Sequence, residues 1–250
     1  MDSRISKAKI KLYASLDTPK GRRKAGIFVA EGTKCVLDIA RRYQPVAAYA
    51  LPQWCAEHPD FQAVPLAPFE LGEITRLSDT PPVIAFFKLP EARQEASYRG
   101  FTIALDGIQD PGNLGTIIRM ADWMGIGTIV ASPETADCFN PKAVQASMGA
   151  LAGVDIIYTP LGDFLEKLPV AVPVYGTYMD GVPVYDEQFC SEGVLVMGNE
   201  GHGIAPDLAP LISRRISIPP VGTPVAESLN VGVATAMILA ARATILNING

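Results

Sequence analysis

The chain has 250 residues, of which 48% are hydrophobic and 19% are charged, and its formal net charge is −5. This length allows one or two domains, and this composition is that of a well-packed globular protein rather than a generally basic nucleic-acid coat. The four cysteines show no CxxC spacing, so they support neither a metal site nor a redox centre, and they fit a reducing, cytoplasmic location.

The charge is distributed unevenly along the chain. Residues 1–24 contain eight basic and two acidic side chains, a net of +6, whereas the other 226 residues carry 13 basic and 24 acidic ones, a net of −11. A basic arm on an acidic body suits binding to a polyanion at one end of the protein. A solvated terminal helix that keeps the chain soluble would give the same pattern.

The first 90 residues are expected to form a small α/β unit that begins with a basic helix around residues 3–15. The expected strands cover residues 28–30, 46–51 and 83–88, and the expected helices cover residues 33–42 and 70–78. Residues 91–100 are polar, and we expect them to be the linker between two domains.

From residue 101 onward the pattern alternates between strand and helix. The expected strands cover residues 101–105, 127–131, 154–158, 172–176, 193–197 and 215–218, and the expected helices cover residues 113–124, 141–150, 163–168, 206–211 and 228–246. This alternation predicts an α/β fold with a mostly parallel sheet and helices on both faces. The last helix is apolar enough to be considered as a membrane span, but its polar residues favour a buried helix of a globular protein.

Polar side chains and glycines recur in three blocks after predicted strands. The first block is Asp110-Pro111-Gly112-Asn113-Leu114-Gly115, and Arg119 follows on the same helix. Glycine lets the backbone turn sharply and approach a ligand, while Asn113 is a candidate helix cap. The flanking Ile117-Ile118 predicts a largely buried helix, in which an arginine needs a partner; a surface salt bridge is the alternative.

The second block is Met197-Gly198-Asn199-Glu200-Gly201, at the end of a predicted buried strand. Glycine-rich turns often cradle phosphates, but a carboxylate inside this turn argues against an anion. It suits a cationic or hydroxyl-bearing ligand, or a partner such as Arg119. His202 has no evident orienting partner, so we interpret it as a turn residue rather than a catalyst.

The third block extends from Ile218 to Asn230. Ser228 stands where the N-cap of the last helix is expected, and Asn230 is expected inside its first turn, either as a structural clamp or as a ligand contact. Ligands of open α/β sheets bind at the carboxyl ends of the strands. The three blocks therefore predict one shared pocket.

Together, the blocks resemble the SpoU (TrmH-type) RNA ribose 2′-O-methyltransferases of the SPOUT class. The resemblance covers residues 101–250 and includes the stretch from Asn140 to Ala150. The basic start and Phe28-Val29-Ala30-Glu31-Gly32 are similar to the small substrate-binding domain that many members carry in front. The resemblance thus implies an RNA-binding domain in residues 1–90, a linker in 91–100, and a catalytic domain with a C-terminal trefoil knot in 101–250.

The resemblance also implies a cofactor and a set of site residues. S-adenosylmethionine would lie in the knot, held largely by backbone groups of Gly176, Thr177, Met197, Gly198, Ile218 and Leu229. Arg119 would be the central catalytic residue, and the residues that orient it, the ribose 2′-hydroxyl and the adjacent phosphate would be Asn113, Glu200, Ser228 and Asn230. The substrate would be ribosomal or transfer RNA, and two chains would pair as a homodimer through the first and last helices of the domain, with no metal and no membrane involved.

An arginine is an awkward general base because its pKa exceeds about 12. Our hypothesis is that Arg119 binds a neighbouring phosphate and stabilises the developing alkoxide, whichever group accepts the proton. The one departure from the family pattern is a rather long loop over residues 221–227.

Two other functions compete with this interpretation. An RNA-binding protein that kept the fold but lost catalysis would be expected to lose Arg119 or Asn230, and both are present. A Rossmann-type oxidoreductase would need the dinucleotide fingerprint and a downstream ribose-binding acid, and the sequence has neither.

Overall fold

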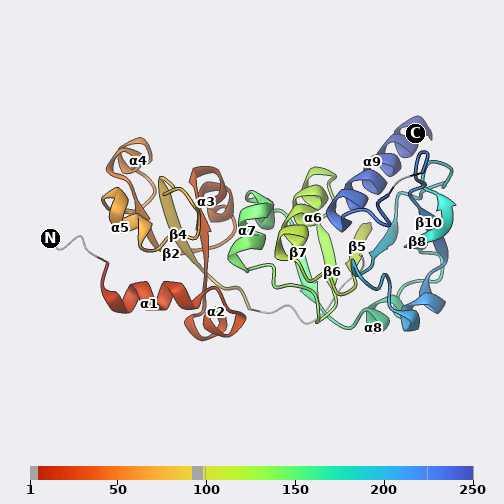
Figure 1. Ribbon diagram of the computed structural model, residues 1–250, viewed down its shortest axis with the longest axis horizontal. Coiled ribbons are helices and arrows are strands. Elements are labelled where there is room, and N and C mark those ends of the chain that lie inside the picture. Colours follow the sequence, from red (N-terminus) through yellow and green to blue (C-terminus); the bar gives the residue numbers. More distant parts are fainter. Residues whose placement is uncertain (1–4, 92–97, 99, 224, 250) are drawn as a thin grey trace. The chain divides into compact units, whose positions relative to one another are not determined.

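The computed structural model describes residues 5–91, 98, 100–223 and 225–249 (Figure 1). By its internal contacts the chain divides into two compact units, one of residues 1–91 and 137–152 and the other of residues 92–136 and 153–250. The expected linker, residues 91–100, lies mostly outside the described residues. The domain boundaries expected from the sequence place residues 137–152 in the second domain. The contacts of this segment group it with the first unit instead.

The first unit contains a four-stranded sheet in the order β1-β4-β2-β3. Its strands are β1 (Ile27–Glu31), β2 (Pro45–Ala50), β3 (Val64–Pro65) and β4 (Val83–Lys88). β4 pairs antiparallel with β1 and β2, and the two-residue β3 pairs parallel with β2. The sequence predicted the three longer strands to within two residues at each end; β3 is too short to give a periodic signal.

The helices of the first unit are α1 (Lys7–Ser15), α2 (Pro19–Ala25), α3 (Thr33–Ala40), α4 (Pro52–Glu57), α5 (Pro68–Gly72) and α7 (Pro141–Ser147). Behind the predicted basic helix the structure has a second one, α2, which the sequence analysis missed. Thr18 caps α2 by accepting a hydrogen bond of 3.0 Å from the Gly21 amide, and Pro19 occupies its first turn. The helix expected at residues 70–78 is shorter, because α5 ends at Gly72.

Residues 137–152 are bound to the first unit by an ion pair and an aromatic cluster. Arg22 is 1% exposed and donates hydrogen bonds to Asp137 Oδ2 from Nε at 3.1 Å and from Nη2 at 2.5 Å. The Phe139 ring lies 4.8 Å from Phe28 and 5.9 Å from Tyr43 between ring centroids. These contacts explain why the segment belongs to this unit.

The second unit contains a six-stranded sheet in the order β10-β8-β9-β5-β6-β7, and every neighbouring pair in it is parallel. Its strands are β5 (Phe101–Leu105), β6 (Thr128–Ala131), β7 (Asp155–Tyr158), β8 (Val174–Pro183), β9 (Gly193–Met197) and β10 (Arg214–Ser217). All residues of the central strands β5 and β9 are buried, as expected when helices cover both faces. The predicted parallel α/β sheet is thus confirmed.

The helices of this unit are α6 (Pro111–Trp123), α8 (Leu161–Leu165) and α9 (Val231–Asn249), with a 3-10 helix at Pro206–Leu211. α6 and α9 pack against each other, and Figure 1 shows them side by side. Leu161, Phe164 and Leu165 of α8 form a hydrophobic core cluster together with Val194 and Val196 of β9. Within the described residues, no helix combines the length and apolarity that crossing a membrane requires.

Candidate active site

The first two blocks meet because the strands that precede them are neighbours. β5 and β9 pair in parallel with Leu105 opposite Met197, so the loops that follow both strands start at the same edge of the sheet. The Asp106 amide donates a hydrogen bond of 2.9 Å to the carbonyl of Met197, which extends the pairing into these loops. The edge carries the polar residues of the first and second blocks.

Three of the expected site residues form one chain of hydrogen bonds across the blocks. Asn230 donates from Nδ2 to Oδ1 of Asn113 at 2.8 Å, and Asn113 donates from Nδ2 to Oε1 of Glu200 at 2.8 Å. The amide of Asn113 is therefore fully oriented, with its oxygen accepting and its nitrogen donating. This chain of hydrogen bonds fixes the carboxylate of Glu200 where the loops of the three blocks meet.

The turn that carries Glu200 is itself anchored. Asn199 donates from Nδ2 to the carbonyl of Gly107 at 2.7 Å and accepts from the amide of Gly201 at 2.8 Å. Gly198 leaves no room for a side chain, because a Cβ there would come within 2.3 Å of the backbone of Gly203. These contacts set the path of the backbone on both sides of Glu200.

Asp106 holds the far end of the same turn, and the sequence analysis gave it no role. Its Oδ2 accepts a hydrogen bond of 2.7 Å from the amide of Ala205. Burial raises the pKa of Asp106 above its ordinary value, although the Ala205 amide partly offsets this effect. The sequence signal that could have identified this residue is its carboxylate, which directly follows the fully buried strand β5.

The last helix starts later than predicted. Asn230, not Ser228, is its N-cap: Oδ1 of Asn230 accepts hydrogen bonds from the amides of Gly232 at 3.0 Å and Val233 at 3.2 Å. Ser228 is exposed, and it has no hydrogen bond to any residue that the structure describes. The cap of α6 also differs from the one expected, because Asp110 caps this helix and Asn113 lies in its first turn.

Arg119 does not have the buried, paired environment that its neighbours suggested. Ile117 and Ile118 are fully buried, but Arg119 is exposed on α6. In the described part of the chain it makes neither a hydrogen bond nor an ion pair, so the alternative of a surface salt bridge is not found there either. Its guanidinium is available to an anionic ligand.

The six expected cofactor positions lie on or after three adjacent strands, β10, β8 and β9. Gly176 and Thr177 lie inside β8 rather than behind it, since this strand continues to Pro183. A Cβ at Gly176 would come within 2.8 Å of the side chain of Ile212, so this glycine is required by packing. Thr177 donates from Oγ1 to the carbonyl of Val196 at 3.3 Å, which joins β8 to β9.

The remaining positions offer backbone groups and an apolar surface. Met197 is the buried last residue of β9, and within the described residues the backbone groups of Gly198, Ile218 and Leu229 have no hydrogen-bond partner. The loop after β10 exposes large apolar side chains, among them Val221 and Val225. Unpaired backbone groups beside an exposed apolar loop fit a nucleoside-type cofactor that is held mainly by the main chain.

A model of the SpoU rRNA methylase family matches residues 100–240, and this span includes all three blocks. The chain belongs to the SpoU rRNA methylase family. This membership confirms the resemblance on which the sequence analysis relied.

Relatives of this SpoU protein match over nearly their full length. The 23S rRNA (guanosine(2553)-2′-O)-methyltransferase RlmP of Bacillus subtilis is 30% identical over 237 residues, which is 92% of this chain and 94% of the relative. The solved structure of a TrmH-family protein from Porphyromonas gingivalis has a TM-score of 0.85 and 37% identity and covers 95% of this chain and 98% of its own. The SpoU methyltransferase AviRb from Streptomyces viridochromogenes, solved in complex with AdoMet, has a TM-score of 0.84 and 25% identity. The match covers 98% of this chain and 100% of the AviRb chain.

No group of three or more His, Cys, Asp or Glu side chains in the described residues is arranged to bind a metal ion. His202 is exposed, and its Nδ1 lies 3.4 Å from Oδ1 of Asn199, inside the glycine-rich turn. Arg119 and Glu200 are the two charged residues among the five expected catalytic residues.

Proposed function

We infer that this chain transfers a methyl group from S-adenosylmethionine to a ribose 2′-hydroxyl of ribosomal RNA. The observation that carries the inference is the hydrogen-bond chain Asn230–Asn113–Glu200 at the strand ends of a SpoU-family sheet. Its middle residue, Asn113, is on the same helix as Arg119, which is unpaired within the described residues. The relatives support the choice of RNA, because the RlmP protein is named as a 23S rRNA 2′-O-methyltransferase.

The cofactor, when bound, would supply a methyl group on a sulfonium, and breaking that carbon–sulfur bond releases a neutral thioether, which is a good leaving group. The residues of the chain then have to position the ribose hydroxyl and accept its proton. Among the five proposed catalytic residues, Glu200 is the one whose side chain is a carboxylate and can accept a proton, because the guanidinium of Arg119, the amides of Asn113 and Asn230 and the hydroxyl of Ser228 are not bases. The Glu200 carboxylate would accept the hydroxyl proton as the 2′-oxygen takes the methyl group.

Arg119 has an electrostatic role in this proposal. Its exposed guanidinium binds the phosphate next to the target ribose and stabilises the negative charge that develops on the 2′-oxygen. Asn113 orients Glu200, and Asn230 orients Asn113. Ser228, which lies outside the hydrogen-bond chain, would contact the substrate or the cofactor from the loop before α9.

The cofactor would be held by backbone groups of Gly198, Ile218 and Leu229, with Thr177 and Met197 beside them. We propose that the chain is knotted around this site. In the sheet, β8 lies between β9 and β10. The chain therefore crosses over β8 on its way from β9 to β10, and it then returns to place α9 against α6. This path is compatible with a knot, which is rare in proteins and would hold the cofactor loops in place.

Residues 1–90 are proposed to bind the RNA substrate, and residues 101–250 to form the catalytic domain. The basic residues of α1 and α2 support this division. Lys7, Lys11, Lys20 and Lys24 are exposed and unpaired within the described residues, whereas Arg22 is buried against Asp137. The arm therefore offers fewer free cations than its sequence suggests, and they suit phosphates of structured RNA.

Homodimerisation through α6 and α9 is the third part of the proposal. Trp123 is 81% exposed at the end of α6, one helical turn beyond Arg119, and Val233 of α9 is half exposed. A large exposed aromatic side chain is typical of an interface. We also propose a cytoplasmic location, which the ribosomal RNA substrate and the free cysteines support.

The test is methyl transfer to total RNA from a strain that lacks the protein, with ribose methylation mapped to the nucleotide. The wild-type chain should label one 2′-oxygen, and Arg119→Ala should lose this label while keeping its affinity for S-adenosylmethionine. Lys167→Ala, which removes an exposed cation of the second unit, is the matched control and should stay active. Normal methylation by Arg119→Ala would refute the role of Arg119, and the absence of cofactor binding by the wild type would refute the activity.

A further inference from the structure

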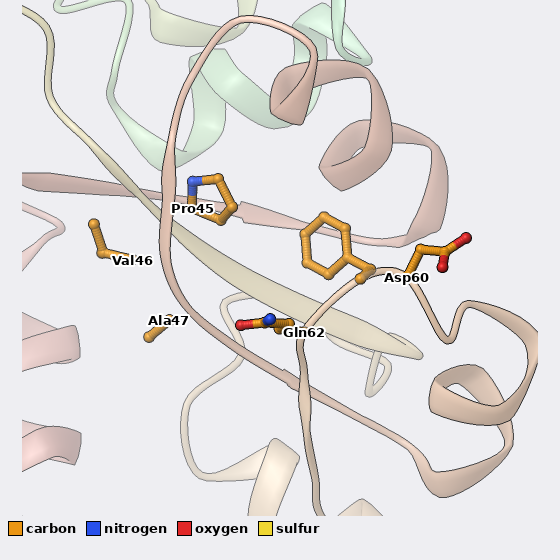
Figure 2. A pocket seen from close by; sticks show the side chains of 6 residues that line it. Pro45, Val46, Ala47, Asp60 and Gln62 are labelled. Atoms are coloured by element: carbon orange, nitrogen blue, oxygen red, sulfur yellow. The ribbon is translucent and has the colours of Figure 1, made fainter.

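The first unit contains a cavity of about 330 Å³ that the proposed chemistry does not use (Figure 2). It is lined by Pro45, Val46, Ala47, Asp60, Phe61 and Gln62. This volume is at the lower end of the range for small-molecule sites, so it accommodates one planar ring system rather than a large ligand.

The cavity lies where two parallel strands separate. β2 and β3 pair only at Tyr49 with Val64 and at Ala50 with Pro65, and the residues that line the cavity come before these pairs on both strands. The pairing of β2 with β4 is also irregular between Pro45 and Ala47. This edge of β2 is thus unpaired by β3 at the cavity and paired with it from Tyr49 onward, so only a short stretch of β2 is open on this side.

One wall of the cavity is a fixed aromatic ring. Phe61 is half-buried, and its ring packs edge-on against Trp54 with centroids 5.5 Å apart and planes at 83°. Trp54 is held in turn by a stack on His58 at 4.3 Å and by a hydrogen bond of 2.9 Å from Nε1 to Oγ1 of Thr33. Because Phe61 is already ordered, stacking a ligand on it costs little conformational entropy.

The polar groups of the cavity are unsatisfied by the protein. In the described residues, neither Gln62 nor Asp60 makes a hydrogen bond or an ion pair, and both are exposed. Figure 2 shows the Gln62 amide on the side of Ala47, and the Asp60 carboxylate pointing away from Pro45, Val46 and Ala47. An amide offers one donor and one acceptor side by side, and a carboxylate nearby disfavours a phosphate in the cavity itself.

We propose that this cavity is a subsite for one unpaired nucleobase of the RNA substrate. The base stacks on Phe61 and pairs its edge with the Gln62 amide, which gives the subsite a preference among the four bases. The proposal rests on the proposed function, because the RNA substrate is what brings a nucleobase to this unit. It assigns to the first unit a base-reading role in addition to the phosphate contacts of its basic arm.

Fluorine NMR of the full chain tests this directly. The protein has two tryptophans, Trp54 and Trp123, so labelling with 5-fluorotryptophan gives two resonances, which Trp123→Phe assigns. Titration with AMP, GMP, CMP and UMP in the millimolar range should shift the Trp54 resonance saturably with at least one nucleotide and leave Trp123 unmoved. Phe61→Ala and Phe61→Leu should weaken this binding by about 5-fold or more, since both remove the stacking face.

Gln62→Ala should reduce the difference in affinity between the nucleotides, whereas Gln188→Ala, an exposed glutamine of the second unit, should leave it unchanged. A Trp54 resonance that no nucleotide moves, or a shift that persists in both Phe61 variants, overturns the proposal. In methyl-transfer kinetics, Phe61→Leu should raise KM for RNA and leave kcat and cofactor affinity unaltered; an unaltered KM also overturns it. The titration needs no methyl transfer, so it decides the proposal even if the wild-type chain proves inactive on RNA.

Discussion

Asn230 donates a hydrogen bond of 2.8 Å to the side-chain oxygen of Asn113, although the two residues lie 117 positions apart. The same Asn230 caps α9 through the amides of Gly232 and Val233. One side chain therefore sets both the start of the last helix and, through Asn113, the orientation of Glu200. Stability and activity are coupled at this residue, and different substitutions separate them.

Asn230→Asp should keep the stability of the protein and lose its activity. Aspartate caps a helix as well as asparagine does but cannot donate to Asn113. We expect an unchanged free energy of unfolding and a fall in kcat on the order of 10²-fold from misplacement of Glu200. Chemical denaturation and methyl-transfer kinetics on the same samples measure the two effects.

Asn230→Ala is the matched comparison, because it removes both the cap and the donor. It should lose the same activity and, in addition, about 1 kcal/mol of stability. Full activity in Asn230→Asp would show that the bond to Asn113 does not position the catalytic carboxylate.

Asp106 gives a prediction about the glycine-rich turn. Asp106→Asn keeps an oxygen that accepts the Ala205 amide, whereas Asp106→Ala leaves the end of the turn unanchored. We expect methyl transfer to survive in the asparagine variant and to fall at least about tenfold in the alanine variant, in which Glu200 is displaced. Equal rates in the two variants would remove the anchoring role.

The raised pKa of Asp106 makes stability depend on pH. Burial lifts this pKa above its ordinary value of 3.8, so the folded state retains the proton to a higher pH than the unfolded state does. The free energy of unfolding therefore falls as the pH rises from below 3.8 through the raised pKa, and Asp106→Asn should lack this contribution. Urea denaturation of both proteins across this range measures the difference; parallel curves would contradict it.

The ion pair of Arg22 with Asp137 should be essential for the first unit. Asp137→Ala leaves a guanidinium that is 1% exposed without its carboxylate, and we expect a loss of about 3 kcal/mol in the free energy of unfolding. Arg22→Met combined with Asp137→Asn removes the buried charge and should be more stable than Asp137→Ala alone. Thermal denaturation ranks the variants, and the opposite order would show that the buried charge tolerates the loss of its partner.

The basic arm should bind RNA through exposed lysines. Lys20→Ala combined with Lys24→Ala should weaken RNA binding and reduce the slope of log affinity against log salt by about 2, one unit for each phosphate contact. Filter binding at several salt concentrations gives the slope, and Lys167→Ala of the second unit serves as the control. An unchanged slope in the double variant would show that RNA phosphates do not contact Lys20 and Lys24.

Trp123 should stabilise the proposed homodimer. Replacing this 81% exposed side chain by alanine removes the largest apolar surface on that face of α6, and the dimer dissociation constant should rise tenfold or more. Sedimentation equilibrium measures the constant for both proteins. A monomeric wild-type chain, or equal constants, would refute an interface at α6.

The sequence alone predicted most of the second unit. Its central strands β5 and β9 are continuous apolar runs, and such runs between glycine-rich turns are a local signal of a buried parallel strand. Asn113 follows β5, Glu200 follows β9 and Asn230 follows β10. The sequence predicted that they share one pocket, because the direction of a parallel strand decides at which edge of the sheet the next loop starts, whereas their roles came from the family resemblance.

The tertiary structure decided what those side chains contact. Sequence placed the caps at Ser228 and Asn113, but the caps are Asn230 and Asp110, because either residue of each pair suits the position and only the path of the loop selects one. Arg22 counted as a free charge until Asp137, 115 residues away, paired with it. Local patterns encode which residues form strands and helices; which polar groups become buried, paired or free depends on partners that folding brings from distant parts of the chain.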